Sequence, residues 1–352
     1  MEEYIAFDSH KRYTWAEHEQ VKTRKLRRYR LEHAPGAIRQ ALGGAKPGTA
    51  VALEATANWY WIVDEIEQAG LRPRLVHPRK AKLMMGQINK TDRLDAHGLN
   101  TLQRNGTLPT VWIPPGPLRE RRELTRTRVV LVAQRTRWKN RLTATLAKYG
   151  LPASEYSDPY GKGARQELDS RLEPLPEQTR WAARQMRAQL DALSAQIEQF
   201  EQRLKELVDL TPEMQRLMSL PGVGVILAAT IALEIGEVER FASAERLASY
   251  AGTTPRVHAS GDRVRYGRTR PDVNRYLKWA FAEAANSVAV NHRRCPHRHV
   301  SQLYFRLRLR KGHSRAVGAV ARHLAEAAFH VLRRQQAYRD PTTAQPGRTT
   351  EV

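Results

Sequence analysis

The sequence is poor in cysteine, poor in acidic residues and free of long apolar runs. Its single cysteine, Cys295, excludes an internal disulfide framework and any zinc site built from several cysteines. The longest apolar stretch, roughly residues 220–235, contains Pro221, Gly222 and Gly224 and is too short and too interrupted to cross a membrane. The first residues also lack the apolar run of a signal peptide. We therefore expect a cytoplasmic protein with no membrane segment.

The shortage of acids gives the chain a large positive charge. Lys and Arg number 59 against 36 Asp and Glu, which leaves a formal net charge of +23 over 352 residues. Two segments carry nearly all of this excess: residues 118–149 hold ten basic and two acidic side chains, and residues 256–334 hold eighteen and four. Two basic segments on a nearly neutral remainder predict two surfaces that bind nucleic acid; the alternative is solvated helix faces without a partner. The expected contacts are Arg119, Arg122, Arg126, Arg135, Lys139 and Arg141 in the first segment, and Arg263, Arg265, Arg268 and Arg270 in the second.

Strands alternate with helices in the N-terminal third of the chain, a pattern typical of an α/β domain. Thr91 is a suitable N-cap for one of these helices, and the second strand is able to pair with the first. The expected strands are residues 4–8, 13–15, 50–54 and 74–77, and the expected helices are residues 58–69 and 92–104.

The rest of the chain reads as mainly helical. A basic helix over residues 118–149 is followed by a loop over 150–174 and then by a heptad stripe that runs from Met186 to Leu207. The stripe predicts a coiled coil, formed with a second chain or against the basic helix, and the alternative is an ordinary packed helix. Beyond it, Gly222 and Gly224 lie in a Pro-Gly-Val-Gly turn that resembles a helix-hairpin-helix element, whose backbone N–H groups meet a DNA phosphate; a plain glycine turn is the alternative.

Four carboxylates stand out by their positions. Asp8 and Glu54 each end an expected strand, and Asp92 and Asp95 lie three residues apart in the first turn of an expected helix. Such a cluster of like charges is costly unless a divalent cation neutralises it, and Mg²⁺ prefers oxygen ligands of this kind. Two such ions about 4 Å apart would hold a phosphodiester for in-line attack. His10 and His77, near expected strand ends, are able to line the same site.

The chain resembles the DEDD-type transposases of the bridge-RNA-guided insertion-sequence family. The matching pieces are Ala6-Phe-Asp8-Ser-His-Lys11, Glu54-Ala-Thr-Ala-Asn58-Trp59, Lys90-Thr-Asp92-Arg-Leu-Asp95-Ala and Leu220-Pro-Gly-Val-Gly, in the family's order. The resemblance implies an α/β ribonuclease-H-like (RuvC-like) N-terminal domain, a central helical coiled coil and a mainly α C-terminal transposase domain. It also implies that Asp8, Glu54, Asp92 and Asp95 are catalytic ligands of Mg²⁺, or of Mn²⁺ in its place. Ala57 stands where the family usually has glycine.

The resemblance further implies that Ser260, in a Ser-Gly pair before a basic stretch, is the nucleophile that attacks DNA. From the residues alone, the same pair is more typical of a simple loop. The expected domains are residues 1–116, 117–210 and 211–335, with a disordered tail over 336–352.

The predicted function is that of an insertion-sequence transposase, a DNA recombinase that works through a serine–DNA intermediate. The expected partners are donor and target DNA duplexes, a structured guide RNA and further copies of the chain in a homodimer or homotetramer, in the bacterial cytoplasm at the nucleoid. One alternative is a RuvC-like metal-dependent, structure-specific endonuclease that uses water. The other is a non-catalytic nucleic-acid-binding protein.

Overall fold

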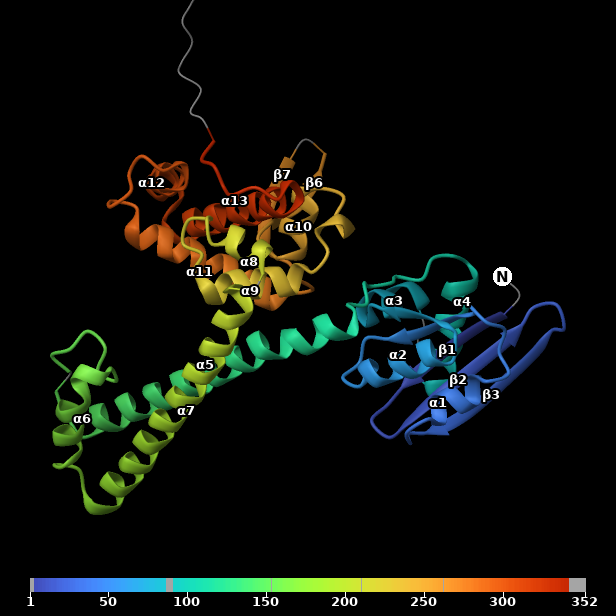
Figure 1. Ribbon diagram of the computed structural model, residues 1–352, viewed down its shortest axis with the longest axis horizontal. Coiled ribbons are helices and arrows are strands. Elements are labelled where there is room, and N and C mark those ends of the chain that lie inside the picture. The colour runs from blue at the N-terminus through green and yellow to red at the C-terminus, as the bar shows by residue number, and fades with distance from the viewer. Residues whose placement is uncertain (1–2, 87–90, 153, 210, 262, 342–352) are drawn as a thin grey trace, which may run out of the picture. The chain divides into compact units, whose positions relative to one another are not determined.

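The computed structural model describes residues 3–86, 91–152, 154–209, 211–261 and 263–341. The chain divides into two compact units, Met1–Pro114 and Pro115–Val352 (Figure 1). Among the described residues, no helix is long and apolar enough to span a membrane.

The first unit is built on a five-stranded mixed sheet. Its strands occur in the order β3-β2-β1-β4-β5; β1 pairs antiparallel with β2, β2 antiparallel with β3, and β4 parallel with both β1 and β5. The strands are β1 (Glu3–Ser9), β2 (Tyr13–Gln20), β3 (Lys25–Glu32), β4 (Ala50–Glu54) and β5 (Arg72–Val76). The central strands β1 and β4 are almost entirely buried, as expected for strands with apolar residues on both faces.

Two small cores flank this sheet. Ile5, Phe7, Val51 and Leu53 point to one face, where they pack against the buried side of α1 and α2. The alternate residues Ala6 and Ala52 point to the other face, where they pack against α3 and α4. The helices are α1 (Ala37–Leu42), α2 (Trp59–Gln68), α3 (Pro78–Met85) and α4 (Asp92–Arg104).

The second unit begins with two long helices that lie antiparallel, α5 (Gly116–Lys148) and α7 (Glu177–Asp209). Leu142 and Leu146, near the end of α5, pack with Leu190, near the start of α7, and Arg128 pairs with Glu201 further along. The heptad stripe of α7 is therefore covered within the same chain. Leu190 packs with α5, whereas Leu204 lies in a core that includes Ala229 and Leu233. The short helices η1 (Lys162–Ala164) and α6 (Arg165–Leu172) lie between the two in sequence.

The remainder of the second unit is a helical bundle with one small hairpin. Its largest core draws apolar side chains from every α-helix of this part. The elements are α8 (Pro212–Leu217), α9 (Val225–Ile235), η2 (Val238–Arg240), α10 (Ala244–Tyr250), β6 (Pro255–Ser260), β7 (Arg263–Thr269), α11 (Arg275–Asn291), α12 (His299–Lys311) and α13 (His313–Arg334). Strands β6 and β7 form a separate two-stranded sheet at the edge of this bundle (Figure 1).

The mixed α/β N-terminal region and the helical C-terminal region are confirmed. The ribonuclease-H-like classification, the coiled coil and the finer domain boundaries stay predictions. The expected strands and helices of the first unit are present, but sequence reasoning missed β3, α1 and α3. The start of the expected tail is held in place, because Tyr338 donates its backbone N–H to the Ser219 hydroxyl at 2.7 Å. Residues 342–352 lie outside the described residues.

Candidate active site

Asp8 and Glu54 occupy the same edge of the sheet. Strands β1 and β4 are parallel neighbours whose last paired residues are Phe7 and Leu53, and the two acids follow them directly. Because side chains alternate along a strand, both acids lie on the face of Ala6 and Ala52, which α4 covers. The adjacency that the sequence could only suggest therefore follows from the register.

Helix α4 brings two further acids to this face. The Thr91 hydroxyl caps the helix by accepting the backbone N–H of Leu94 at 3.2 Å, which fixes where the first turn begins. Asp92 and Asp95 lie in that turn, and Leu99, on the same stripe of the helix, is buried against the sheet. The first turn is thus placed so that both aspartates approach the edge that carries Asp8.

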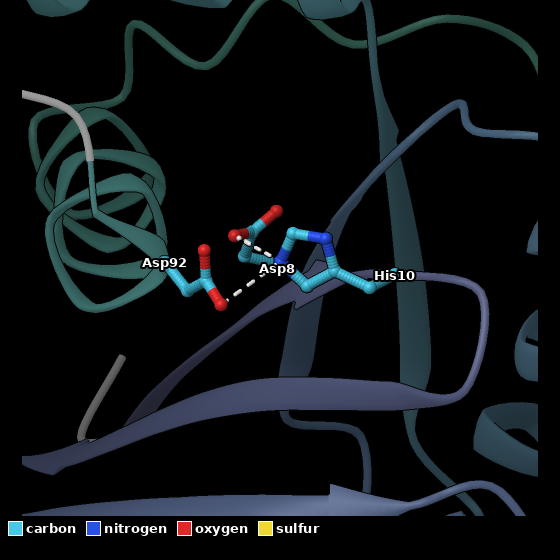
Figure 2. A group of neighbouring side chains, drawn as sticks. All are labelled: Asp8, His10 and Asp92. Atoms are coloured by element: carbon cyan, nitrogen blue, oxygen red, sulfur yellow. Dashed lines mark hydrogen bonds and ion pairs between the residues drawn. The ribbon is translucent and has the colours of Figure 1, made fainter.

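His10 joins the two groups of acids. Its Nε2 lies 3.1 Å from Asp8 Oδ2 and 3.2 Å from Asp92 Oδ2 (Figure 2). The same ring nitrogen therefore contacts the Asp8 carboxylate of β1 and the Asp92 carboxylate of α4. The main chain at His10 is fixed by Asn58, whose side-chain amide donates to the His10 carbonyl at 2.8 Å. Tyr13 donates its hydroxyl proton to Asp92 Oδ2 at 2.7 Å.

The electrostatics of the site are those of crowded carboxylates. Burial raises the pKa of Asp8; His10 opposes this shift, whereas the negative charges of Asp95 and Asp92 add to it. The hydrogen bond to Asp92 likewise raises the pKa of Tyr13. Asp95 shares the first turn of α4 with Asp92. A site of this kind gains from a bound cation, because the cation offsets the mutual repulsion of the acids.

The donor set suits a divalent metal ion. Among the described residues, only Asp8, His10 and Asp92 form a group whose ligand atoms all lie within 4.8 Å of one another. The carboxylates of Asp8 and Asp92 offer the hard oxygen ligands that Mg²⁺ and Mn²⁺ take, and His10 adds a nitrogen that suits Mn²⁺ better than Mg²⁺. Glu54 and Asp95 are not members of this group, and their role as ligands stays a prediction. The side chains present at this site thus suit the divalent ion that the sequence predicts.

Ser260 lies in the second unit, at the end of the hairpin strand β6 rather than in a polar loop. It is exposed and pairs across the hairpin with Arg263, while His258 pairs with Arg265. Residues directly opposite each other on antiparallel strands point to the same face, so the serine shares its face with two arginines. Asp262, which follows in the sequence, lies outside the described residues.

The other basic residues of this segment are also exposed. Arg268 lies on β7, and Arg270, beyond the strand, forms an ion pair with Asp272 at 2.7 Å. The hairpin therefore presents cationic side chains to solvent on a thin ribbon.

Among the basic residues of the long helix α5 that are predicted to bind nucleic acid, those in its first half are buried or half-buried and those in its second half are more exposed. Arg119 and Arg122 are only 6% and 4% exposed. Arg122 donates to the carbonyls of Leu233 and Glu234 at the end of α9, at 2.7 and 3.0 Å. Arg126 forms a two-pronged hydrogen bond with the buried Glu234 carboxylate, at 2.7 and 3.0 Å. Arg122 and Arg126, which the sequence predicts to contact nucleic acid, instead attach α5 to α9 of the helical bundle. Arg119 is buried, so it is not available for such a contact either.

The three other predicted contacts on α5 are more accessible. Arg141 is exposed, Arg135 is half-buried, and Lys139 pairs with Asp158 at 3.3 Å. The predicted nucleic-acid surface along this helix is therefore reduced to its second half.

The glycine turn before α9 has a packing function. Gly222 has φ of +78°, and a Cβ atom there would lie 2.3 Å from the Ala284 carbonyl oxygen of α11. Gly224 is exposed and is the N-cap residue of α9. Gly222 thus allows the turn to approach α11 closely, while a phosphate contact at Gly224 stays a prediction.

Sequence reasoning passed over two residues near the acids. Tyr13 and Glu17, both on β2, contact α4, but their signal was only that of alternating polar residues in a strand. The sequence indicates His10 as a side chain able to line the site, but the predicted ligand set contains only the four acids.

Comparisons with known proteins agree with the sequence motifs. A family model described as "Transposase" of the DEDD IS110 type matches residues 5–151, and one described as "Transposase IS116/IS110/IS902 family" matches residues 214–301. The chain is 26% identical over 250 residues to a "Probable family 20 transposase" of Pseudomonas aeruginosa, covering 69% of this chain and 72% of the relative. It is 25% identical over 278 residues to the "Transposase for insertion sequence element IS1111A" of Coxiella burnetii, covering 77% and 74%.

Proposed function

This chain belongs to the IS110/IS116 family of insertion-sequence transposases and carries a DEDD domain, and on this premise we propose that it joins donor and target DNA by transesterification through a serine–DNA intermediate. The observation that carries the proposal is the convergence of Asp8, Asp92 and His10 beside Glu54 and Asp95 at one sheet edge. The mixed sheet that presents these acids supports the ribonuclease-H-like classification of the domain.

The acids would hold Mg²⁺, or Mn²⁺ in its place. When bound, the ion would withdraw negative charge from a phosphate oxygen and stabilise the leaving oxygen. Asp8 and Glu54 are fixed by the sheet and Asp92 and Asp95 by a capped helix, so two rigid elements orient the ligands. His10 contacts both elements, through Asp8 of β1 and Asp92 of α4.

Ser260 would supply the nucleophile. Its hydroxyl oxygen forms a new ester bond to phosphorus, one phosphorus–oxygen ester bond to deoxyribose breaks, and the hydroxyl proton leaves the serine while the departing sugar oxygen gains one. The freed sugar hydroxyl of the exchanged strand later reverses the step and releases the serine. Arg263 and Arg265, on the same face of the hairpin, would bind the phosphate that is attacked and offset its developing charge.

The two accessible basic surfaces suit one DNA and one RNA partner. We propose that a structured guide RNA pairs with donor and target DNA, so that the protein needs shape and charge more than base contacts. Strand exchange joins two duplexes, which calls for a homodimer or homotetramer, with the coiled-coil segment of α5 and α7 as one contact. The proposed setting is the bacterial nucleoid.

The decisive experiment looks for a covalent protein–DNA adduct. Full-length protein is incubated with Mg²⁺, end-labelled element-junction DNA and the transcript of the element's non-coding end, and the products are separated in SDS. We expect an adduct that disappears in Ser260→Ala and in Asp92→Asn. Ser314→Ala, at another exposed serine of the same unit, is the matched control and should retain the adduct.

Two results would refute the serine mechanism. Cleavage without an adduct, unchanged in Ser260→Ala and lost in Asp92→Asn, would indicate a metal-dependent nuclease that uses water. Binding without cleavage in every variant and in the wild type would indicate a non-catalytic nucleic-acid-binding protein.

A further inference from the structure

A further buried carboxylate, that of Glu17, lies beneath α4, away from the four acids. Glu17 of β2 is fully buried and accepts hydrogen bonds from three donors. Arg28 Nε lies 2.8 Å from Glu17 Oε2, while His97 Nδ1 and Asn100 Nδ2 lie 2.9 and 3.2 Å from Glu17 Oε1. Two of these donors, His97 and Asn100, belong to α4, the helix whose first turn carries Asp92 and Asp95.

Glu17 is the middle one of three β2 residues whose side chains make polar contacts with α4, and each of these contacts is called a rung below. Tyr13, Glu17 and Glu19 alternate along β2 and therefore point to the same face of the sheet. Tyr13 contacts Asp92 in the first turn of α4, Glu17 contacts His97 and Asn100 in the middle, and Glu19 pairs with Arg104 at the end, at 2.9 Å. One strand thus holds the whole length of the helix through polar contacts.

The rungs differ in strength because they differ in burial. Glu19 and Arg104 are 23% and 45% exposed, and an ion pair of this kind contributes little. The Glu17 side chain is 1% exposed, so the loss of a donor would leave a buried charge without full compensation. Burial alone would raise the pKa of Glu17, but the bonds from Arg28, His97 and Asn100 hold it below its ordinary value. The Glu17 carboxylate is therefore ionised, and two of its three hydrogen-bond donors attach α4 to β2.

The rest of the α4 interface contains few large apolar side chains from the sheet. Leu99 and Leu102 of α4 share a core with Ala6, Ala52 and Val76, and the two alanines are too small to interlock strongly with a helix. Gln103 donates to the carbonyls of Ile5 and Ala50, at 3.1 and 3.2 Å, and fixes the last turn. His97 and Asn100 are the anchors nearest the acids, since His97 lies only two residues beyond Asp95.

We infer that Glu17 is a positioning residue, which sets the rotation and height of α4 so that Asp92 and Asp95 meet Asp8 and Glu54. This inference rests on the proposed metal site. Metal–ligand distances tolerate a change of about 0.2 Å, whereas sliding by one residue along a helix is about 1.5 Å. Loss of an orienting partner behind metal ligands typically costs 10- to 100-fold in metal affinity.

The test compares three variants of the full-length protein. Glu17→Gln removes the buried charge, His97→Ala removes one donor from a side chain that is 46% exposed, and Arg104→Ala breaks the exposed rung as the matched control. Two readouts are taken: amide hydrogen exchange at residues 95–98, and the Mn²⁺ dissociation constant. The exchange readout does not depend on metal, and Asp95 is the first of these amides, bonded to the Thr91 carbonyl at 2.9 Å.

We expect Glu17→Gln and His97→Ala to accelerate exchange at residues 95–98 and to weaken Mn²⁺ binding about 10- to 100-fold. Arg104→Ala should leave both unchanged. If Glu17→Gln fails to fold, His97→Ala decides, because its side chain is half exposed and its loss is mild. Folded variants with wild-type exchange and wild-type Mn²⁺ affinity would overturn the inference. A wild-type protein that binds no Mn²⁺ would refute the proposed metal site instead, and the exchange rates would still decide the role of Glu17.

Discussion

Replacing Arg122 by methionine should lower the stability of the second unit strongly and leave its affinity for nucleic acid unchanged. Methionine keeps the length and apolar stem of the side chain, so the change isolates the guanidinium. That group donates to two carbonyls at the end of α9 and lies 3.8 Å from the buried Glu234 carboxylate. Without the guanidinium, the buried carbonyls of Leu233 and Glu234 lose a hydrogen-bond donor and the Glu234 carboxylate loses a nearby positive charge.

The magnitude follows from the burial of these groups. Breaking a buried, hydrogen-bonded ion pair from one side costs about 3–5 kcal/mol. In a unit of this size, each kcal/mol lowers the melting temperature by about 2–4 °C, so Arg122→Met should lower it by roughly 6–20 °C. Differential scanning calorimetry of the full-length protein measures this, and the nucleic-acid affinity of the folded variant should equal that of the wild type.

Arg141→Met on the same helix is the matched control. Arg141 is exposed, so its replacement should change stability by less than about 0.5 kcal/mol. It should weaken binding to a DNA duplex and reduce the slope of log affinity against log salt by about 0.9, the contribution of one phosphate contact. An Arg122→Met variant with unchanged melting and a salt slope reduced like that of Arg141→Met would refute the structural role of Arg122.

Three further changes have defined outcomes. Gly222→Ala should cost about 3 kcal/mol or more, because a Cβ at φ +78° would lie 2.3 Å from the Ala284 carbonyl oxygen; urea denaturation measures it. Asn274→Ala should cost about 2–4 kcal/mol, because it removes the N-cap of α11 and a 2.8 Å hydrogen bond to Glu234, and unchanged melting would contradict this. Asp8→Asn should raise the melting temperature at about pH 7 in metal-free buffer. Folding raises the pKa of Asp8, so the stabilising contribution of this group is complete below its unfolded pKa and is lost as the pH rises through its folded pKa. Asparagine stays uncharged and avoids this loss at about pH 7, and the gain should vanish at about pH 3, where Asp8 itself is protonated in both states.

Local sequence patterns identified the four acids as candidates, and the family resemblance added Ser260. Asp8 and Glu54 were marked because they end apolar strands, and Asp92 and Asp95 because a three-residue spacing shares one helix face. These are local patterns, and the helix over Asp92–Arg104 appears in the structure with the predicted bounds. Strand β3 could not be predicted from the sequence, because it is a largely exposed, charged strand at the edge of the sheet, where it pairs with β2.

Only the tertiary structure decided which of these residues meet and which arginines face solvent. The register of β1 against β4 brings Asp8 beside Glu54, and hydrogen bonds between residues some eighty positions apart, such as Glu17 with His97, place α4 over them. Burial likewise separated Arg122 from Arg141, although both are arginines on one helix. A single sequence encodes periodicity and residue type, whereas pairing between distant segments is decided by packing and by the need to satisfy every buried charge.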